Sequence, residues 1–269
     1  MKKLLSLLLA LLMVFALAAC GNTEPAEEDP ADQQEAADLD YVKEKGKITV
    51  GYTIYEPMNY TDENGEFTGF DTELAKAVFE QLGLTPEFVE INWDTKELAL
   101  ASKEIDCVWN GMTVTPERAE AMELTNPYLK NSQVLLVKSD MEYTDTSSLL
   151  GKVVTAEMGS AGQEAIEADA NLSQVEFVGK TAQTECLVEV KAGTAAGAVL
   201  DKTLALAMTG EGTDYADLVV VQELTPETYA VAFRKGSNIA AEVNKVFDTM
   251  LADGSLAALA EKYGLELAD

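Results

Sequence analysis

The chain has 269 residues, 47% of them hydrophobic, with a formal net charge of −28, three cysteines and no histidine. Its acidity argues against binding to nucleic acid or anionic lipid, and the absence of histidine removes His-dependent hydrolysis and most zinc chemistry. We therefore expect no nucleic-acid partner, no metal site and no cofactor.

The first twenty residues, MKKLLSLLLALLMVFALAAC, have the pattern of an export signal. Two lysines precede an apolar stretch, and small residues then lead to a cysteine. A transmembrane anchor is the alternative, but the apolar stretch is short for one. Because LAAC matches the bacterial lipobox, we predict a lipoprotein signal peptide over residues 1–19 and a lipidated Cys20 that carries several acyl chains, palmitate among them. Such chains would anchor the protein to the outer face of the cell membrane.

Residues 22–40 contain eight acids, two prolines and no base. This composition is too polar to form a core, so we predict that residues 20–40 are a disordered tether. The folded part is expected to begin near Tyr41 and to continue to the end of the chain.

From residue 47 onward, strand and helix patterns alternate. Strands are indicated at KITVGY, PEFVEIN, IDCVWN and SQVLLVK. Helices are indicated at DTELAKAVFEQLG (71–83), with Asp71 as its cap, and at DTKELALASKE. Cys107 falls in the buried strand IDCVWN and Cys186 in the helical pattern TECLVEV. We expect two buried free thiols, with a disulfide as the alternative.

A second run of units begins at GKVVTAEMGSAGQEAIEADA, which indicates a strand, a turn and a helix. AGAVLDKTLALAM indicates a strand and a helix, and two strands, ADLVVVQEL and ETYAVAFRKG, precede the C-terminal helices. This alternation predicts an α/β fold with parallel-rich sheets covered by helices on both faces. Ligands of such folds bind at the carboxyl ends of strands, where this sequence has three polar junctions.

The first junction is the segment GMTVTPER. Thr115 can cap a helix, and Pro116 suits its first position. Arg118 then lies in the first turn, where the helix dipole disfavours a cation. This placement favours binding of an external anion. The alternative is that Arg118 only pairs with Glu117 or Glu120 on an exposed helix.

The other junctions lie at the turn GSAG and at Asp201. Ser160 can cap the following helix and leave the amides of Ala161 and Gly162 free for an anion. Asp201 can accept hydrogen bonds from an ammonium group, or it can be a simple helix cap. An anion site that faces a carboxylate suits a zwitterion, and a free α-amino acid fits.

Five segments, in this order, make the chain similar to the family 3 extracellular solute-binding proteins, the amino-acid receptors of ABC importers. They are YEPMNYTDENGEFTGFDTELAKAV, WNGMTVTPERAEAMELTNPY, GKVVTAEMGSAG, GAVLD, and the C-terminal RKGSN with LADGSLAALAEKYG. The similarity spans about residues 41–264.

The resemblance implies a two-lobed α/β fold of the periplasmic-binding-protein-like type II, with two hinge crossovers. Lobe 1 would comprise residues 41–129 and 230–269, and lobe 2 residues 133–225. The implied function is that of a monomeric receptor and not an enzyme. It would bind a free L-amino acid between closing lobes and deliver it to the permease of an ABC importer.

The same resemblance implies a role for individual residues. Arg118 and the hydroxyl and amide of Thr113 would hold the ligand α-carboxylate, together with Ser160 and the amide of Ala161. The carbonyl of Gly111 and the carboxylate of Asp201 would take the α-ammonium group. The remaining expected pocket residues are Tyr55 and Trp93, which would stack on the ligand or else belong to the core, and Tyr52 and Asn110.

Two departures from the family pattern leave the charged contacts in place. The turn has Ser160 and Ala161 where Thr-Thr or Thr-Gly is common, and GTAAGAVLD lacks the usual Asp-Ala before its strand. Glu157, just before the turn, could pair with a cationic ligand and would then favour a basic amino acid. It could equally face solvent on this acidic surface.

Two other classes of function are compatible with the same fold. One is an exported enzyme similar to cyclohexadienyl dehydratases, although no pair of acids stands out in the sequence. The other is a sensory protein that presents its ligand to a membrane receptor.

Overall fold

The computed structural model describes residues 30–269, with side chains described from residue 38 onward. The predicted signal peptide, the predicted lipidation of Cys20 and the predicted tether up to residue 29 lie outside the described residues. Within the described range, none of the helices combines the length and the apolarity that a membrane span requires.

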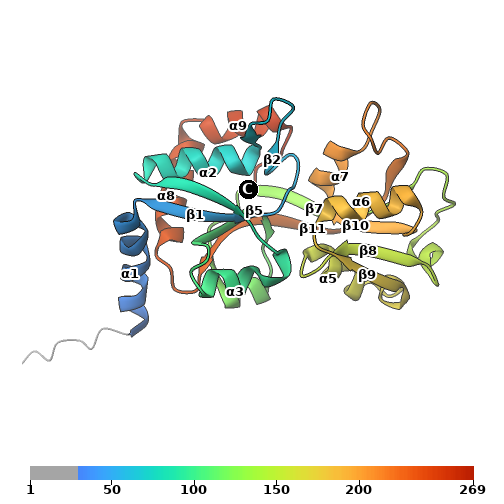
Figure 1. Ribbon diagram of the computed structural model, residues 1–269, viewed down its shortest axis with the longest axis horizontal. Helices are drawn as coiled ribbons and strands as arrows, with labels where there is room; N and C mark the ends of the chain where they lie inside the picture. The colour runs from blue at the N-terminus through green and yellow to red at the C-terminus, as the bar shows by residue number, and fades with distance from the viewer. Residues whose placement is uncertain (1–29) are drawn as a thin grey trace, which may run out of the picture.

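The last part of the predicted tether is wrong, because residues 30–40 belong to a helix. Helix α1 runs over Pro30–Lys45, at the left of Figure 1, and its C-terminal part packs against the folded part. Leu39 of this helix is buried, and Asp38 pairs with Arg234 at 2.7 Å. Burial of apolar surface and a charge-assisted hydrogen bond thus hold a segment whose average composition resembles that of a linker.

The strands of lobe 1 form one end of a nine-stranded sheet, at the left of Figure 1. There β1 (Lys47–Tyr52) lies parallel to and between β4 (Thr85–Glu90) and β5 (Cys107–Thr113). A separate hairpin of β2 (Tyr60–Thr61) and β3 (Phe67–Thr68) lies beside them. The order β4-β1-β5 places the ends of β1 and β5 side by side.

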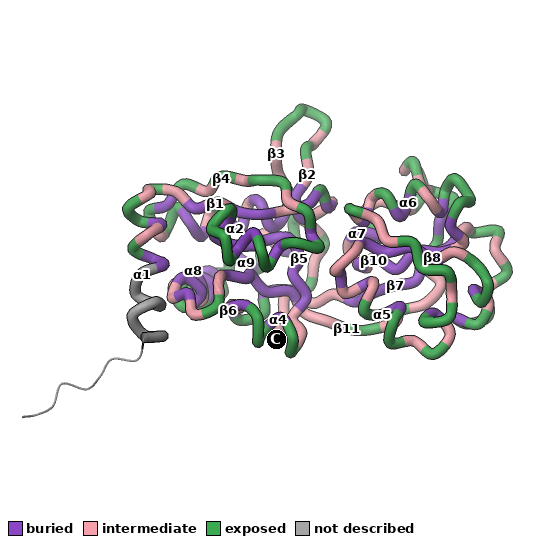
Figure 2. Tube along the Cα trace, turned by 60° about the horizontal axis from the view of Figure 1, so that its bottom comes forward, coloured by how far each residue is buried: buried purple, intermediate pink, exposed green. Residues whose placement is uncertain are grey.

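The strands of lobe 2 form the other end of the sheet. Strand β8 (Val153–Glu157) lies parallel to and between β9 (Glu176–Lys180) and β10 (Gly197–Asp201). Every residue of β5 and of β10 is buried, as the purple tubes of Figure 2 show. Strands that are covered on both faces explain the continuous apolar runs in the sequence.

Two long antiparallel strands join the lobes. Strand β7 (Leu129–Lys138) leads from lobe 1 into lobe 2, and β11 (Leu218–Arg234) returns. In lobe 1, β11 pairs with β5 and with β6 (Met122–Leu124), whereas β7 pairs with β10 in lobe 2. The segments ADLVVVQEL and ETYAVAFRKG are therefore parts of one strand rather than two. Its register shifts near Val221 and Leu224, which suits the bend of a strand that serves both lobes.

Helices cover both faces of each lobe in Figure 1. Lobe 1 carries α2 (Phe70–Gln81), α3 (Lys96–Ala101), α4 (Pro116–Ala121), α8 (Ile239–Ala252), α9 (Ser255–Tyr263) and the 3-10 helix η1 (Trp93–Thr95). Lobe 2 carries α5 (Ala161–Ala168), α6 (Gln183–Ala192), α7 (Lys202–Met208) and the 3-10 helices η2 (Thr146–Leu149) and η3 (Leu172–Gln174).

The two cysteines of the described residues are free thiols. Cys107 in β5 and Cys186 in α6 are both buried and unbonded, which confirms the expected free thiols.

Asp71 does not cap its helix, because Gly69 occupies the cap position. Its carboxyl instead accepts hydrogen bonds from the amide of Gly111 at 2.7 Å and the hydroxyl of Tyr128 at 2.8 Å. Burial raises the pKa of Asp71 to about 7. Asp71 thus fixes the end of β5 from 40 residues away.

Candidate functional site

The carboxyl ends of the lobe 1 strands meet those of lobe 2 across a narrow cleft. The Lys96 ammonium donates to the carbonyl of Gly159 at 3.0 Å, and the Tyr55 hydroxyl contacts that of Thr203. The lobes are therefore in contact in this structure. The outer end of the cleft is a hollow of about 590 Å³, lined by Thr53, Ile54, Glu90, Ile91 and Asn92 of lobe 1 and Thr181, Ala182, Thr184 and Glu185 of lobe 2.

Arg118, in the first turn of α4, lies between the lobes and reaches Gly159 and Glu164 of lobe 2. Its helix begins as expected, with the Thr115 hydroxyl accepting the Arg118 amide at 3.2 Å and Pro116 at the first position. The guanidinium is buried and donates to the carbonyl of Thr113 at 3.1 Å. It also pairs with Glu164 of α5, in lobe 2, at 2.7 Å. The alternative of an exposed pair with a glutamate of its own helix is wrong.

The turn before α5 closes the opposite side of the cleft. The Ser160 hydroxyl accepts the Gln163 amide at 3.3 Å, which confirms Ser160 as the helix cap. Gly159 has a φ of +68°, and a Cβ there would lie 3.0 Å from the Cα of Asp94 in lobe 1. The Arg118 guanidinium donates to the Gly159 carbonyl at 3.4 Å, so the start of α5 lies near Arg118. The first amides of a helix favour an anion.

Asp201 ends β10 and is buried. Its side chain does not cap α7, so the simple-cap alternative is wrong. Oδ1 instead accepts hydrogen bonds from Asn131 Nδ2 at 2.8 Å and Gln133 Nε2 at 2.7 Å, and Oδ2 accepts one from Gln183. Sequence reasoning missed these three amides. The signal was the polar pair Asn131 and Gln133, which alternate on strand β7 just before its apolar run at residues 134–137.

Glu157, at the end of β8, is 2% exposed, and its Oε1 has no hydrogen-bond partner among the described residues. Burial, and then the nearby Asp201, raise the pKa of Glu157. Lys96 is a residue that sequence reasoning missed; burial, and then the Arg118 guanidinium, lower its pKa to about 8. Lys96 occupies the first position of α3, the same unfavourable place for a cation that drew attention to Arg118.

The two aromatic candidates, Tyr55 and Trp93, border the cleft and also belong to the hydrophobic cores. The Tyr55 hydroxyl shares a hydrogen bond with that of Tyr229, on β11, at 2.6 Å. The Lys96 ammonium lies 5.1 Å from the centre of the Trp93 ring, so a cation already faces this ring.

The contacts of Asn110 and Tyr52 lie within lobe 1. The Asn110 side chain accepts from the amide and hydroxyl of Thr53 and donates to the Thr53 carbonyl and to Asn59. The Tyr52 ring packs against Phe67, with ring centres 4.7 Å apart, and is only half-buried. For both residues, contact with a ligand stays a prediction.

Gly111 provides a test of how tightly the cleft is built. Its φ is +57°, and a Cβ there would lie 2.8 Å from the Tyr55 ring and 3.1 Å from the Tyr229 ring. We expect Gly111→Ala to lower the free energy of unfolding by roughly 2–4 kcal/mol, because backbone strain adds to the ring clash. Gly65→Ala is the matched control, since Gly65 has a φ of +83° but open space around it. If chemical denaturation showed equal losses of unfolding free energy for the two variants, the Tyr55 and Tyr229 rings would have moved aside without cost.

Comparison with protein families matches residues 48–266 to the bacterial extracellular solute-binding proteins, family 3. The chain belongs to this family. The match covers most of the described structure and includes every residue of the cleft discussed above.

Among curated relatives of this family 3 protein is the arginine-binding extracellular protein ArtP of Bacillus subtilis. The two are 28% identical over 265 residues, which cover 98% of each chain. The ABC transporter glutamine-binding protein GlnH of the same organism is 28% identical over 278 residues, 98% of this chain and 97% of the relative.

A solved structure of an ancestral amino acid-binding protein, a precursor of cyclohexadienyl dehydratase, is 32% identical to this chain. It superposes with a TM-score of 0.76, over 84% of this chain and 98% of the other. The expected two-lobed fold of the periplasmic-binding-protein type II is thereby confirmed.

Proposed function

We propose that this protein is an extracytoplasmic receptor that binds a free L-amino acid between its lobes and delivers it to the permease of an ABC importer. The observation that carries the proposal is the convergence of Arg118 and the start of α5 on one side with Asp201 on the other. An anion site and a carboxylate in one closed cleft suit the two charges of an α-amino acid. The names of the relatives, which bind arginine or glutamine, support this class of ligand.

The ligand carboxylate would lie on Arg118, the hydroxyl and amide of Thr113, the Ser160 hydroxyl and the Ala161 amide. Arg118 already holds a carboxylate, that of Glu164, at 2.7 Å. Glu164 is half-exposed, so a ligand can displace it into water at little cost. The carbonyl of Gly111 and the carboxylate of Asp201 would take the ammonium group, with Tyr55 and Trp93 against the ligand side chain.

The ligand side chain is proposed to be basic. Glu157 is buried with an unpartnered oxygen, and a buried carboxylate without a partner is unfavourable. A guanidinium or ammonium group from the ligand would satisfy it. Arginine, lysine and ornithine are therefore the first candidates.

The wider biology of the protein is part of the same proposal. The lipid anchor at Cys20 would keep the receptor on the outer face of the membrane, where a monomer presents its closed lobes to the permease. Ligand binding would act by shifting the population towards the closed lobes. The protein is proposed to be a receptor and not an enzyme, although an ancestor of cyclohexadienyl dehydratase has the same fold.

A thermal-shift panel tests the proposal. The protein is first unfolded and refolded to remove carried-over ligand, and is then mixed with each of the twenty amino acids, cystine, ornithine, arogenate and prephenate. We expect the melting temperature to rise with arginine, lysine or ornithine, and Glu157→Gln to reduce that rise while Glu167→Gln, on the exposed face of α5, leaves it unchanged.

Other outcomes correct particular parts of the proposal. A rise with a different amino acid would keep the receptor and remove Glu157 as the selecting residue. No rise with any amino acid would overturn the receptor. Turnover of arogenate or prephenate would replace it with the dehydratase.

A further inference from the structure

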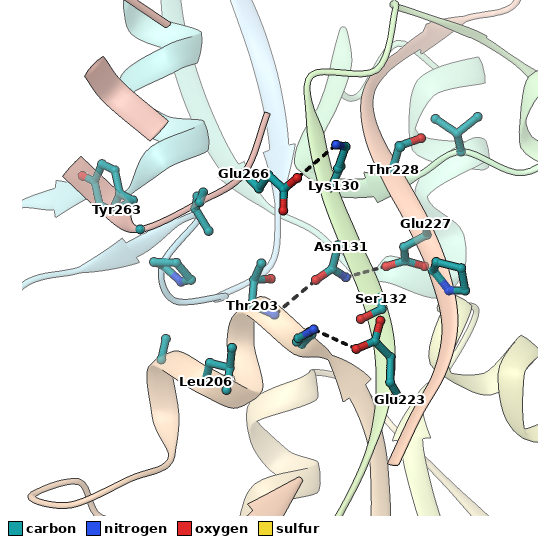
Figure 3. Close-up of a pocket in the computed structure, with 17 residues that line it drawn as sticks. Lys130, Asn131, Ser132, Thr203, Leu206, Glu223, Glu227, Thr228, Tyr263 and Glu266 are labelled. Carbon is teal, nitrogen blue, oxygen red and sulfur yellow. Dashed lines mark hydrogen bonds and ion pairs between the residues drawn. The ribbon is translucent and has the colours of Figure 1, made fainter. Parts of the chain in front are cut away.

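A second carboxyl group lies beside Asp201, on the strand that joins the lobes. Glu227 of β11 accepts hydrogen bonds from Asn131 Nδ2 at 2.5 Å and from Gln133 Nε2 at 2.9 Å. The same two nitrogens donate to Asp201 Oδ1, at 2.8 and 2.7 Å. Figure 3 shows the Asn131 amide directed at Glu227, between the two connecting strands. Two oxygens that share both of their donors lie only a few ångström apart.

The nearby lysines do not neutralise this pair. Lys130 is bound by Glu266 and Asp269, each at 3.0 Å, and Lys202 is bound by Glu223 at 2.7 Å. Both lysines line the hollow drawn in Figure 3, where Lys130 is labelled beside Glu266, and both are engaged by carboxylates other than the pair. Among the described residues, Asp201 and Glu227 have no ion pair with a lysine or arginine.

Ionisation of both carboxyl groups, of which Asp201 is buried and Glu227 is half-buried, is strongly disfavoured without a cation, because the like charges repel each other at close range. Burial, and then the Asp201 carboxylate, raise the pKa of Glu227 to about 9. The retained proton lies on Glu227.

A third carboxyl group, that of Glu157, lies near both Asp201 and the Lys96 ammonium. Glu157 is 2% exposed with one unpartnered oxygen, and it lies close enough to Asp201 for their charges to interact. Asp201 of β10 therefore has two acidic neighbours, Glu227 of β11 and Glu157 of β8. A cation from outside the chain is the group that would satisfy them together.

We propose, on the basis of the receptor function above, that Asp201 and Glu227 form one two-carboxyl site, which holds a proton when the cleft is empty and exchanges it for the ammonium group of the ligand. The proton leaves Glu227 for the solvent as the ammonium group enters. The charge of the site then changes from one negative charge to two, which the ligand cation offsets. Glu227, on the connecting strand β11, is thus a residue that takes part in recognising the ligand.

The other titratable groups around the pair have different roles. The hydroxyls of Tyr55 and Tyr229 face it, and burial raises the pKa of each, so both stay neutral near pH 7. The Lys96 ammonium lies near Glu157 and opposes the rise in the pKa of that residue. Lys96, with its pKa of about 8, and Glu157 are the groups that could contribute protons of their own.

The exchange makes affinity depend on pH in a defined direction. Protons compete with the ligand for the pair wherever the empty site is protonated, which is below the pKa of about 9 of Glu227. The dissociation constant should therefore fall as the pH rises from about 6 to about 8, by up to about tenfold per pH unit.

Isothermal titration calorimetry with L-arginine tests the exchange. If the thermal-shift panel selects another amino acid, that amino acid is the probe. The titration is done at pH 7 in phosphate, HEPES and Tris, whose enthalpies of protonation differ. We expect the observed heat to vary with the buffer by an amount that corresponds to the release of about one proton per bound ligand.

Two variants identify the source of the proton. Glu227→Gln keeps the shape of the side chain but cannot release a proton, so the heat should become independent of the buffer and the pH dependence should flatten while L-arginine still binds. Glu223→Gln, on the same strand but paired with Lys202 at the surface, should release the same proton as the natural protein.

Each alternative outcome has a distinct meaning. Binding whose heat is independent of the buffer in the natural protein would overturn the exchange but keep the receptor. Proton release that persists in Glu227→Gln would also overturn it, and its loss in Glu157→Gln would identify that residue as the source. The absence of binding by every amino acid would instead overturn the receptor itself.

Discussion

Replacing Arg118 with alanine is expected to abolish amino-acid binding and to leave the fold intact. In the proposed complex the guanidinium gives two charge-assisted hydrogen bonds to the ligand carboxylate, each worth about 1.5–3 kcal/mol. Their loss weakens binding by roughly 3–6 kcal/mol, which is about 10²- to 10⁴-fold in the dissociation constant. Calorimetry with the amino acid selected by thermal shift measures this loss.

The fold should survive because the partners of Arg118 remain satisfied without it. Glu164 is half-exposed and can turn to water, and the Thr113 carbonyl borders the cleft. Glu120→Ala is the matched control, because it removes an exposed charge from the same helix. Unchanged affinity in Arg118→Ala would contradict the site, and a collapse of the circular dichroism spectrum would show a structural role instead.

Arg118 and Ser160 could be found from sequence because their signals are local. A capping hydroxyl, a proline at the first helical position and a misplaced cation all occur within four residues of Thr115. The alternation of strands and helices similarly follows from short apolar patterns, so the fold class was predictable. Lys96 carries the same local signal as Arg118, a cation in the first turn of a helix, so it too could be predicted from the sequence.

Other parts of the site depend on contacts between distant segments. Glu227 and Asp201 are brought together by Asn131 and Gln133, which lie about 70 to 95 positions away in the chain. Glu227 falls in TPETY, a segment whose proline and polar residues indicate a turn rather than the middle of a long strand. The pair becomes visible only when β7 and β11 lie side by side.

The error at residues 30–40 has a related cause. The average composition of a segment decides whether it can fold alone, and by that measure the segment is a linker. A segment can also be held by a few specific contacts with a folded neighbour. Here Leu39 is buried, and Asp38 meets Arg234, a residue nearly two hundred positions later.

Replacing Arg234 with methionine is expected to be the most destabilising of these changes. The guanidinium donates to Asp38 at 2.7 Å, to Asp106 at 3.2 Å and to the carbonyl of Ile105 at 2.8 Å. The Asp106 side chain is only 1% exposed. Removing one member of a buried ion cluster leaves an under-compensated charge and typically costs about 3–5 kcal/mol.

The loss should appear as a fall of roughly 10 °C in the melting temperature, since about 1 kcal/mol corresponds to 2–4 °C in a chain of this size. Lys235→Met is the control, because Lys235 is an exposed neighbour whose contacts, with the Ala119 carbonyl at 2.8 Å and with Glu123 at 3.8 Å, lie at the surface. Hydrogen exchange adds a local measurement at the Leu39 amide, which donates to Asn238 at 3.0 Å. If Arg234→Met releases α1, the exchange of the Leu39 amide becomes faster in the variant, whereas that of the core amides of β5 does not. If it exchanges no faster, α1 is held by its apolar contacts, and the ion cluster acts only within lobe 1.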